Sequence, residues 1–135
     1  MEITPKIRHA IALAALIYIL ALVSCPQSAN AKREHLERWY QEQTCNGLLE
    51  YRLADRKRVD CLTKTHAIEY DFADKWAECT GQALYYASQA GKQPGCVLIV
   101  EEMDRDCRHI RALWAINREF KVRISVWTVG KSCRN

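Results

Sequence analysis

Three acidic residues, Glu50, Asp60 and Glu69, are spaced so that they could meet on neighbouring strands of a sheet. If two hairpins turn around Asp55 and Lys64-Thr65, antiparallel pairing places Glu50 opposite Asp60 and Asp60 opposite Glu69. Directly opposed Cβ atoms in such pairs lie about 4.5–5.5 Å apart. Carboxylates that close repel each other, which raises a pKa or requires a cation, and oxygen clusters suit hard ions such as Mg²⁺. The spacing therefore predicts a divalent-metal site, with a solvent-exposed acidic sheet face as the alternative.

A stripe of polar side chains follows these acids on a predicted helix. Lys75, Gln82 and Tyr86 are separated by seven and four residues, so they share one face of a helix that begins near Asp74 and ends at Gly91. A lysine, an amide and a phenol at the end of an acidic strand form a suitable wall for a phosphate. The same stripe also fits an ordinary solvated helix face.

Hydrophobic periodicity predicts the elements that would position these residues. Residues 66–72 alternate between apolar and acidic side chains, as in a half-buried strand, and residues 96–100 are all apolar, as in a strand buried within a sheet. Three of the four tryptophans, Trp76, Trp114 and Trp127, are expected in the core. We predict helices over 32–44, 74–90 and 104–120, strands over 48–53, 58–63, 66–72, 96–100 and 122–129, and a turn at 94–95. The order α-β-β-β-α-β-α-β predicts a single-domain α/β sandwich with a mixed sheet.

Taken in order, these motifs resemble those of the PD-(D/E)xK nuclease superfamily, in its RecB-like branch. Asp60 matches the motif aspartate, Glu69 matches the acid of the (D/E)xK element, and Gln82-Ala83-Leu84-Tyr85-Tyr86 matches the Q-h-x-x-Y motif. Glu50 could stand for an additional upstream acid. The resemblance covers about residues 33–101. It implies a restriction-endonuclease-like αβββαβ core, to which this chain adds a C-terminal helix and strand.

The resemblance also implies a reaction, the metal-assisted hydrolysis of phosphodiester bonds in DNA. Asp60 and Glu69, with Glu50 as a third acid, would hold Mg²⁺ or Mn²⁺, and the metal would acidify the attacking water. The DNA backbone would contact Gln82, Tyr86 and Arg58. Arg58 belongs to a basic hairpin tip, residues 52–58, whose phosphate contacts would set affinity rather than sequence choice.

One position departs from the family pattern. The family lysine should stand two residues after Glu69, where this sequence has Asp71. The family tolerates a lysine relocated to the next helix, and Lys75 is the candidate for this catalytic role. If Lys75 does not reach the metal, the domain would bind without cutting.

An apolar run near the start of the chain predicts export. Residues 10–23 form fourteen apolar residues after Lys6 and Arg8, fewer than the about 20 that span a bilayer. The run leads to Ala29-Asn30-Ala31, so residues 1–31 are expected to be a cleaved signal peptide before a domain over 32–135. Alternatively, Leu22-Val23-Ser24-Cys25 resembles a lipobox, with a lipoprotein signal over 1–24 and an acylated Cys25 in the outer membrane.

Cysteine usage supports the export prediction. Without Cys25, six of the seven cysteines remain, an even number that indicates disulfides in an oxidising compartment, with fifteen complete pairings open. The sequence contains no C-x-x-C pair, so nothing in it indicates a zinc knuckle. The net charge of +4 allows a polyanionic partner without requiring one.

Two functions remain open from the sequence. The ordered set Asp60, Glu69, Lys75, Gln82 and Tyr86 favours an exported nuclease that acts on DNA in the periplasm or outside the cell. The lipobox, the crowded cysteines and the missing lysine favour a non-catalytic envelope protein instead. Such a protein would use a degenerate nuclease fold as a structural component of a secretion or conjugation complex.

Overall fold

The computed structural model describes residues 33–133, so the predicted signal over residues 1–31 and Cys25 lie outside the described part of the chain. The elements are α2 (Glu37–Thr44), β1 (Leu48–Arg52), β2 (Arg58–Leu62), β3 (His66–Phe72), η1 (Ala73–Lys75), α3 (Trp76–Ala90), β4 (Gln93–Val100), α4 (Met103–Phe120) and β5 (Ser125–Gly130). This succession follows the predicted order. Within residues 33–133, no helix has the length and apolar character needed to cross a membrane.

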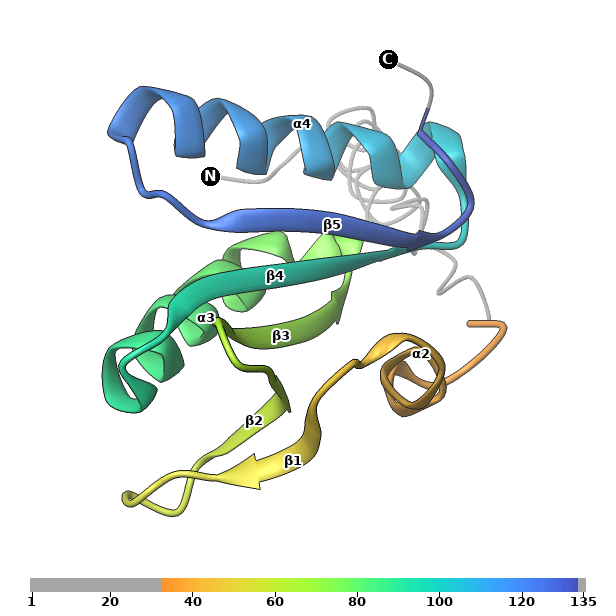
Figure 1. Cartoon of the computed structure of the whole chain (residues 1–135). Helices are drawn as coiled ribbons and strands as arrows, with labels where there is room; N and C mark the ends of the chain where they lie inside the picture. Colours follow the sequence, from red (N-terminus) through yellow and green to blue (C-terminus); the bar gives the residue numbers. More distant parts are fainter. Residues whose placement is uncertain (1–32, 134–135) are drawn as a thin grey trace, which may run out of the picture. The chain divides into compact units, whose positions relative to one another are not determined.

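The five strands form one mixed sheet in the order β1-β2-β3-β4-β5 (Figure 1). β1, β2 and β3 are antiparallel neighbours, whereas β3, β4 and β5 run parallel. Cys79 and Ala83 of α3 pack with Ile110 of α4 and Leu98 of β4 in one apolar cluster. Tyr40 of α2 packs in a second cluster, on the other face of the sheet. The predicted α/β sandwich with a mixed sheet is confirmed.

The alternation of β3 decides which side chains face which helix. Tyr70 and Phe72 pack with Tyr40 of α2, whereas Ala67 packs with Tyr86 of α3. Because successive side chains of a strand point to opposite faces, the acids at positions 69 and 71 lie on the α3 side. Both are buried there.

Both predicted hairpin registers are confirmed. Leu49 pairs with Cys61 and Tyr51 with Val59 in the first hairpin, and Cys61 pairs with Ile68 in the second. These registers are the ones that align Glu50, Asp60 and Glu69 across three strands. The alternation breaks at Asp60, however, because Val59 packs on the α3 side and Cys61 on the α2 side. Glu50, across from this break, has a left-handed backbone with φ of 53°.

Two predictions about individual positions are wrong. Pro94 and Gly95 belong to β4 rather than to a turn, because proline costs little near the start of a strand. Trp114 and Trp127 are 45% and 42% exposed, so they are not core residues; only Trp76 packs against a core cluster.

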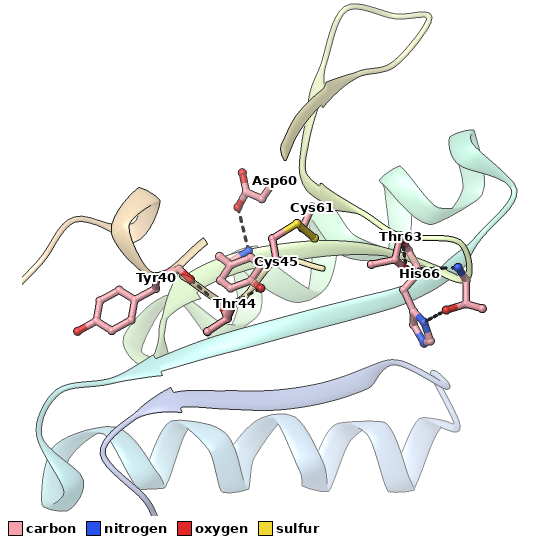
Figure 2. The surroundings of a disulfide bond; sticks show 9 residues. Tyr40, Thr44, Cys45, Asp60, Cys61, Thr63 and His66 are labelled. Carbon is pink, nitrogen blue, oxygen red and sulfur yellow. Dashed lines mark hydrogen bonds between the residues drawn. A yellow bond between two sulfur atoms is a disulfide. The ribbon is translucent and has the colours of Figure 1, made fainter. Parts of the chain in front are cut away.

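The six described cysteines form three disulfides, which selects one of the fifteen pairings. Cys45–Cys61 joins the end of α2 to β2 (Figure 2), Cys79–Cys96 joins α3 to β4, and Cys107–Cys133 joins α4 to the C-terminal segment. Each bond links two different elements. Three disulfides in a domain of this size fit an exported protein.

Candidate functional site

An open pocket of about 470 Å³ lies where β2, β3 and α3 meet the tip of the first hairpin. Its lining comprises Arg56, Lys57, Arg58, Asp60, Glu69, Gln82 and Tyr86. Five of these residues are ones that the sequence predicts for the site: Arg58, Asp60, Glu69, Gln82 and Tyr86. The structure therefore brings together residues from three motifs that are separate in the sequence. We call this pocket the acidic pocket.

Glu69 is the most strongly perturbed acid of the acidic pocket. Its side chain is 7% exposed, and its buried Oε2 atom has no hydrogen-bond partner among the described residues. Burial raises the pKa of the Glu69 carboxyl to about 9, and the neighbouring charges of Asp60 and Asp71 add to this rise. A buried carboxylate with an unused oxygen needs a proton or a cation.

Asp60 lies at the break in β2 and points toward the backbone of β3. Its Oδ2 atom accepts a hydrogen bond of 2.9 Å from the backbone N–H of Tyr70 (Figure 2). Burial raises the pKa of the Asp60 carboxyl to about 6 although this N–H lowers it, and the charge of Glu50 raises it further. Asp60 and Glu69 are thus two neighbouring carboxyls that both resist ionisation.

Glu50 does not line the acidic pocket. Its carboxylate forms an ion pair with Arg58 across the first hairpin. Glu50 still lies near enough to Asp60 for its negative charge to raise the pKa of the Asp60 carboxyl. Glu50 has a left-handed backbone, which is uncommon for a residue in a strand.

Lys75 also lies outside the lining of the acidic pocket. Its Nζ atom is 3.2 Å from Asp71 Oδ1 and 3.1 Å from Glu37 Oε1. Burial raises the pKa of the Asp71 carboxyl, while the Lys75 ammonium opposes that rise. Lys75 is therefore the counter-ion of two acids at the beginning of α3. Glu37 is a residue that sequence reasoning missed, because nothing in the helical pattern shows that α2 reaches Lys75.

The basic hairpin tip is held against α3. The Tyr85 hydroxyl donates a hydrogen bond to the Asp55 carboxylate, and the Lys57 ammonium lies 4.3 Å from the centre of the Tyr85 ring. These contacts place Arg56 and Lys57 at the mouth of the acidic pocket. The basic composition of the tip was visible in the sequence, whereas the role of Tyr85 was not. Cationic side chains beside two carboxyls suit a ligand with a phosphate group.

The donor set of the acidic pocket fits a hard divalent cation. Mg²⁺ is commonly held by one or two carboxylates, with waters and substrate phosphates completing its shell. Asp60 and Glu69 supply two carboxylates, and Glu69 Oε2 accepts no hydrogen bond from the part of the chain that the structure describes. Within residues 33–133, no three His, Cys, Asp or Glu side chains converge closely enough to hold an ion by themselves.

Comparison with known proteins finds no relative of this chain. No family model, curated protein or solved structure matches the chain. Because a fold by itself does not define an activity, the function depends on the chemistry of the site.

Proposed function

We propose that this chain is an exported, metal-dependent, nuclease-like protein that hydrolyses phosphodiester bonds of DNA. The observation that carries the proposal is the lining of the acidic pocket. Asp60, Glu69 and the Gln82–Tyr86 motif, which resemble the PD-(D/E)xK pattern in order, contribute side chains to one open pocket. Their pKa shifts add weight, because paired acids with raised pKa values concentrate at functional sites.

Each part of the acidic pocket has a role in this proposal. Asp60 and Glu69 hold the cation, which when bound lowers the pKa of water and offsets charge on the reacting phosphate. Arg56, Lys57 and Arg58 attract the DNA backbone and add positive charge near the scissile group. The Gln82 amide and the Tyr86 hydroxyl orient the phosphate by hydrogen bonds.

The proposed location follows from the disulfides and the predicted signal. Three disulfides fit an oxidising compartment. Cleavage after Ala31 would release the protein into the periplasm or the medium, whereas acylation of Cys25 would hold it at the outer membrane. Both forms would present the same described domain.

Plasmid cleavage tests the proposal. We expect the wild-type protein to nick or linearise plasmid with Mg²⁺ or Mn²⁺ and not with EDTA, and Asp60→Ala to reduce the rate by about 100-fold or more. Asp104→Ala, at an exposed position of α4, is the matched control and should cut normally. Equal cleavage by the wild type and Asp60→Ala would end the enzyme proposal.

The pairing of Lys75 favours the second candidate function, a non-catalytic envelope protein. A lysine that neutralises Asp71 of β3 and Glu37 of α2 joins α2 to the end of β3 and is not free to orient water. In this function the chain would be a structural or assembly component of an envelope complex for secretion or conjugation.

Replacement of Lys75 separates the two roles open to this side chain, catalysis and charge neutralisation. If Lys75 serves catalysis, Lys75→Met should lower the cleavage rate by about 100-fold, while DNA affinity measured with Ca²⁺ stays within about twofold. Lys131→Met, at an exposed position after β5, is the matched control. Undiminished cleavage by Lys75→Met would show that Lys75 is only the counter-ion of Asp71 and Glu37.

A further inference from the structure

A second pocket, of about 590 Å³, lies at the β2–β3 turn. Its lining comprises Asn46, Thr63, Lys64, Thr65, His66, Ile68 and Trp127. We call it the turn pocket. The described lining residues of the two pockets do not overlap, and no motif of the proposed nuclease site accounts for the turn pocket.

Trp127 provides an aromatic surface in the turn pocket. The side chain is 42% exposed although β5 lies beside the buried strand β4. Its ring rests on Gly95, where an added Cβ would come within 2.8 Å of Trp127 Cζ3. His66 meets the indole in an edge-on contact, with ring centres 5.3 Å apart. The indole is therefore supported from two sides while much of its surface stays open.

The polar part of the turn pocket is ordered before any ligand arrives. His66 Nδ1 lies 2.8 Å from Thr65 Oγ1, and His66 Nε2 lies 3.1 Å from Ser125 Oγ. Thr63 Oγ1 accepts hydrogen bonds from the backbone N–H groups of His66 and Thr65 (Figure 2). Because these contacts fix the turn, a ligand would lose little affinity to ordering of its site.

The charge of the turn pocket is positive. Lys64 lines it, and no Asp or Glu is among its described lining residues. Lys92 Nζ donates a hydrogen bond of 2.7 Å to the Lys64 carbonyl, which brings a second ammonium to the same turn. A pocket lined by an indole and a lysine, with a second ammonium bound at the same turn, matches a base and its phosphate. A neutral sugar fits less well, because no carboxylate is present to accept hydrogen bonds from its hydroxyls.

We propose that the turn pocket binds single-stranded DNA, with one base stacked on Trp127 and the adjoining phosphate at Lys64 and Lys92. The choice of DNA rests on the proposed nuclease function, whereas the stacking surface and the two lysines stand independently of it. The protein would thus hold an unpaired strand at a site separate from the acidic pocket.

Binding in EDTA, where no cleavage occurs, tests this inference. Fluorescence anisotropy would compare a labelled eight-nucleotide oligothymidylate with an abasic oligomer of equal length and charge. We expect Trp127→Ala to weaken thymidylate binding by about 10-fold or more and to leave abasic binding unchanged. Trp114→Ala is the matched control, because Trp114 is equally exposed, at 45%, on α4; it should bind both oligomers as the wild type does.

Two further variants keep the test decisive if Trp127→Ala does not fold. Trp127→Phe keeps an aromatic ring and should retain most of the affinity. Lys64→Gln should reduce the slope of log Kd against log salt by about 0.7, the value of one phosphate contact on a single strand. An unchanged slope together with thymidylate affinity that does not exceed abasic affinity would overturn the inference. Binding of a neutral chitin oligosaccharide in place of thymidylate would overturn it as well.

The experiments distinguish a failure of the turn-pocket inference from a failure of the proposed nuclease function. Plasmid cleavage by a protein whose thymidylate affinity does not depend on Trp127 would reject the turn pocket and leave the nuclease standing. Thymidylate binding that depends on Trp127, in a protein that cuts nothing, would support the turn pocket and reject the nuclease.

Discussion

Glu69→Gln is expected to abolish metal-dependent cleavage and, at the same time, to make the metal-free protein more stable at alkaline pH. The two effects have one cause. The Glu69 carboxyl is buried, and one of its oxygens has no partner within residues 33–133, so the folded protein carries a destabilising negative charge whenever that group ionises. The glutamine amide keeps the size of the side chain and removes the charge.

The sign of the pH dependence follows from the raised pKa of Glu69. The folded state holds the proton up to about pH 9, whereas the unfolded chain releases it near its ordinary pKa of 4.5. The stabilising contribution of the protonated carboxyl is therefore complete below about pH 4.5 and is lost as the pH rises toward 9. The wild type should lose stability over this window, and Glu69→Gln should lose less.

Thermal unfolding in EDTA at pH 5 and pH 9 measures this difference. One pKa unit corresponds to about 1.4 kcal/mol, and about 1 kcal/mol shifts the Tm of a domain of this size by several degrees. We expect Glu69→Gln to gain at least about 5 °C over the wild type at pH 9 relative to pH 5. Glu119→Gln removes the same charge from an exposed position of α4 and should gain nothing. A parallel decline of Glu69→Gln and wild type would show that folding does not raise the pKa of Glu69.

The hairpins show what the sequence determines well. The turn residues between β1 and β2 and between β2 and β3 leave little choice of register, because a slip by one residue would move buried side chains such as Val59 to solvent. The register then aligns Asp60 with its neighbours. For this reason Asp60, Glu69, Gln82 and Tyr86 could be assigned to one region from the spacing and order of the motifs. Glu50 and Lys75 were assigned to the same region but lie outside the described lining of the acidic pocket.

Contacts between distant elements could not be predicted in this way. All of the first three strands lie between Glu37 and Lys75 in the sequence, and only the packing of α2 brings these two side chains within 3.1 Å. Trp127 looks like a core residue because β5 reads as an apolar strand, yet no described helix covers its ring, and it remains 42% exposed. The break in alternation at Asp60 likewise depends on tertiary packing, because Val59 packs with Tyr86 of α3 and Cys61 packs with Tyr40 of α2.

Loss of the Cys79–Cys96 disulfide is expected to destabilise the domain more than loss of Cys107–Cys133, although its loop is shorter. Loop closure alone favours the longer loop, with separations of 26 and 17 residues, but the entropic difference amounts to only about 0.4 kcal/mol. Burial acts in the opposite direction and is larger. Cys79 and Cys96 are both 0% exposed, so alanines there leave a cavity inside the main core cluster.

The position of this disulfide also connects it to the acidic pocket. Cys79 Sγ lies 3.5 Å from the Glu69 carbonyl, and Cys79, Gln82 and Tyr86 follow one another along α3. We therefore expect Cys79→Ala/Cys96→Ala to lower the free energy of unfolding by about 4–5 kcal/mol and to weaken cleavage even where the protein is folded. Cys107→Ala/Cys133→Ala should cost about 2–3 kcal/mol and spare the activity. Urea unfolding of both double variants, followed by cleavage assays below the transition, measures the two effects. A larger loss of stability for the Cys107–Cys133 pair would mean that loop closure, rather than packing between α3 and β4, dominates the contribution of these bonds.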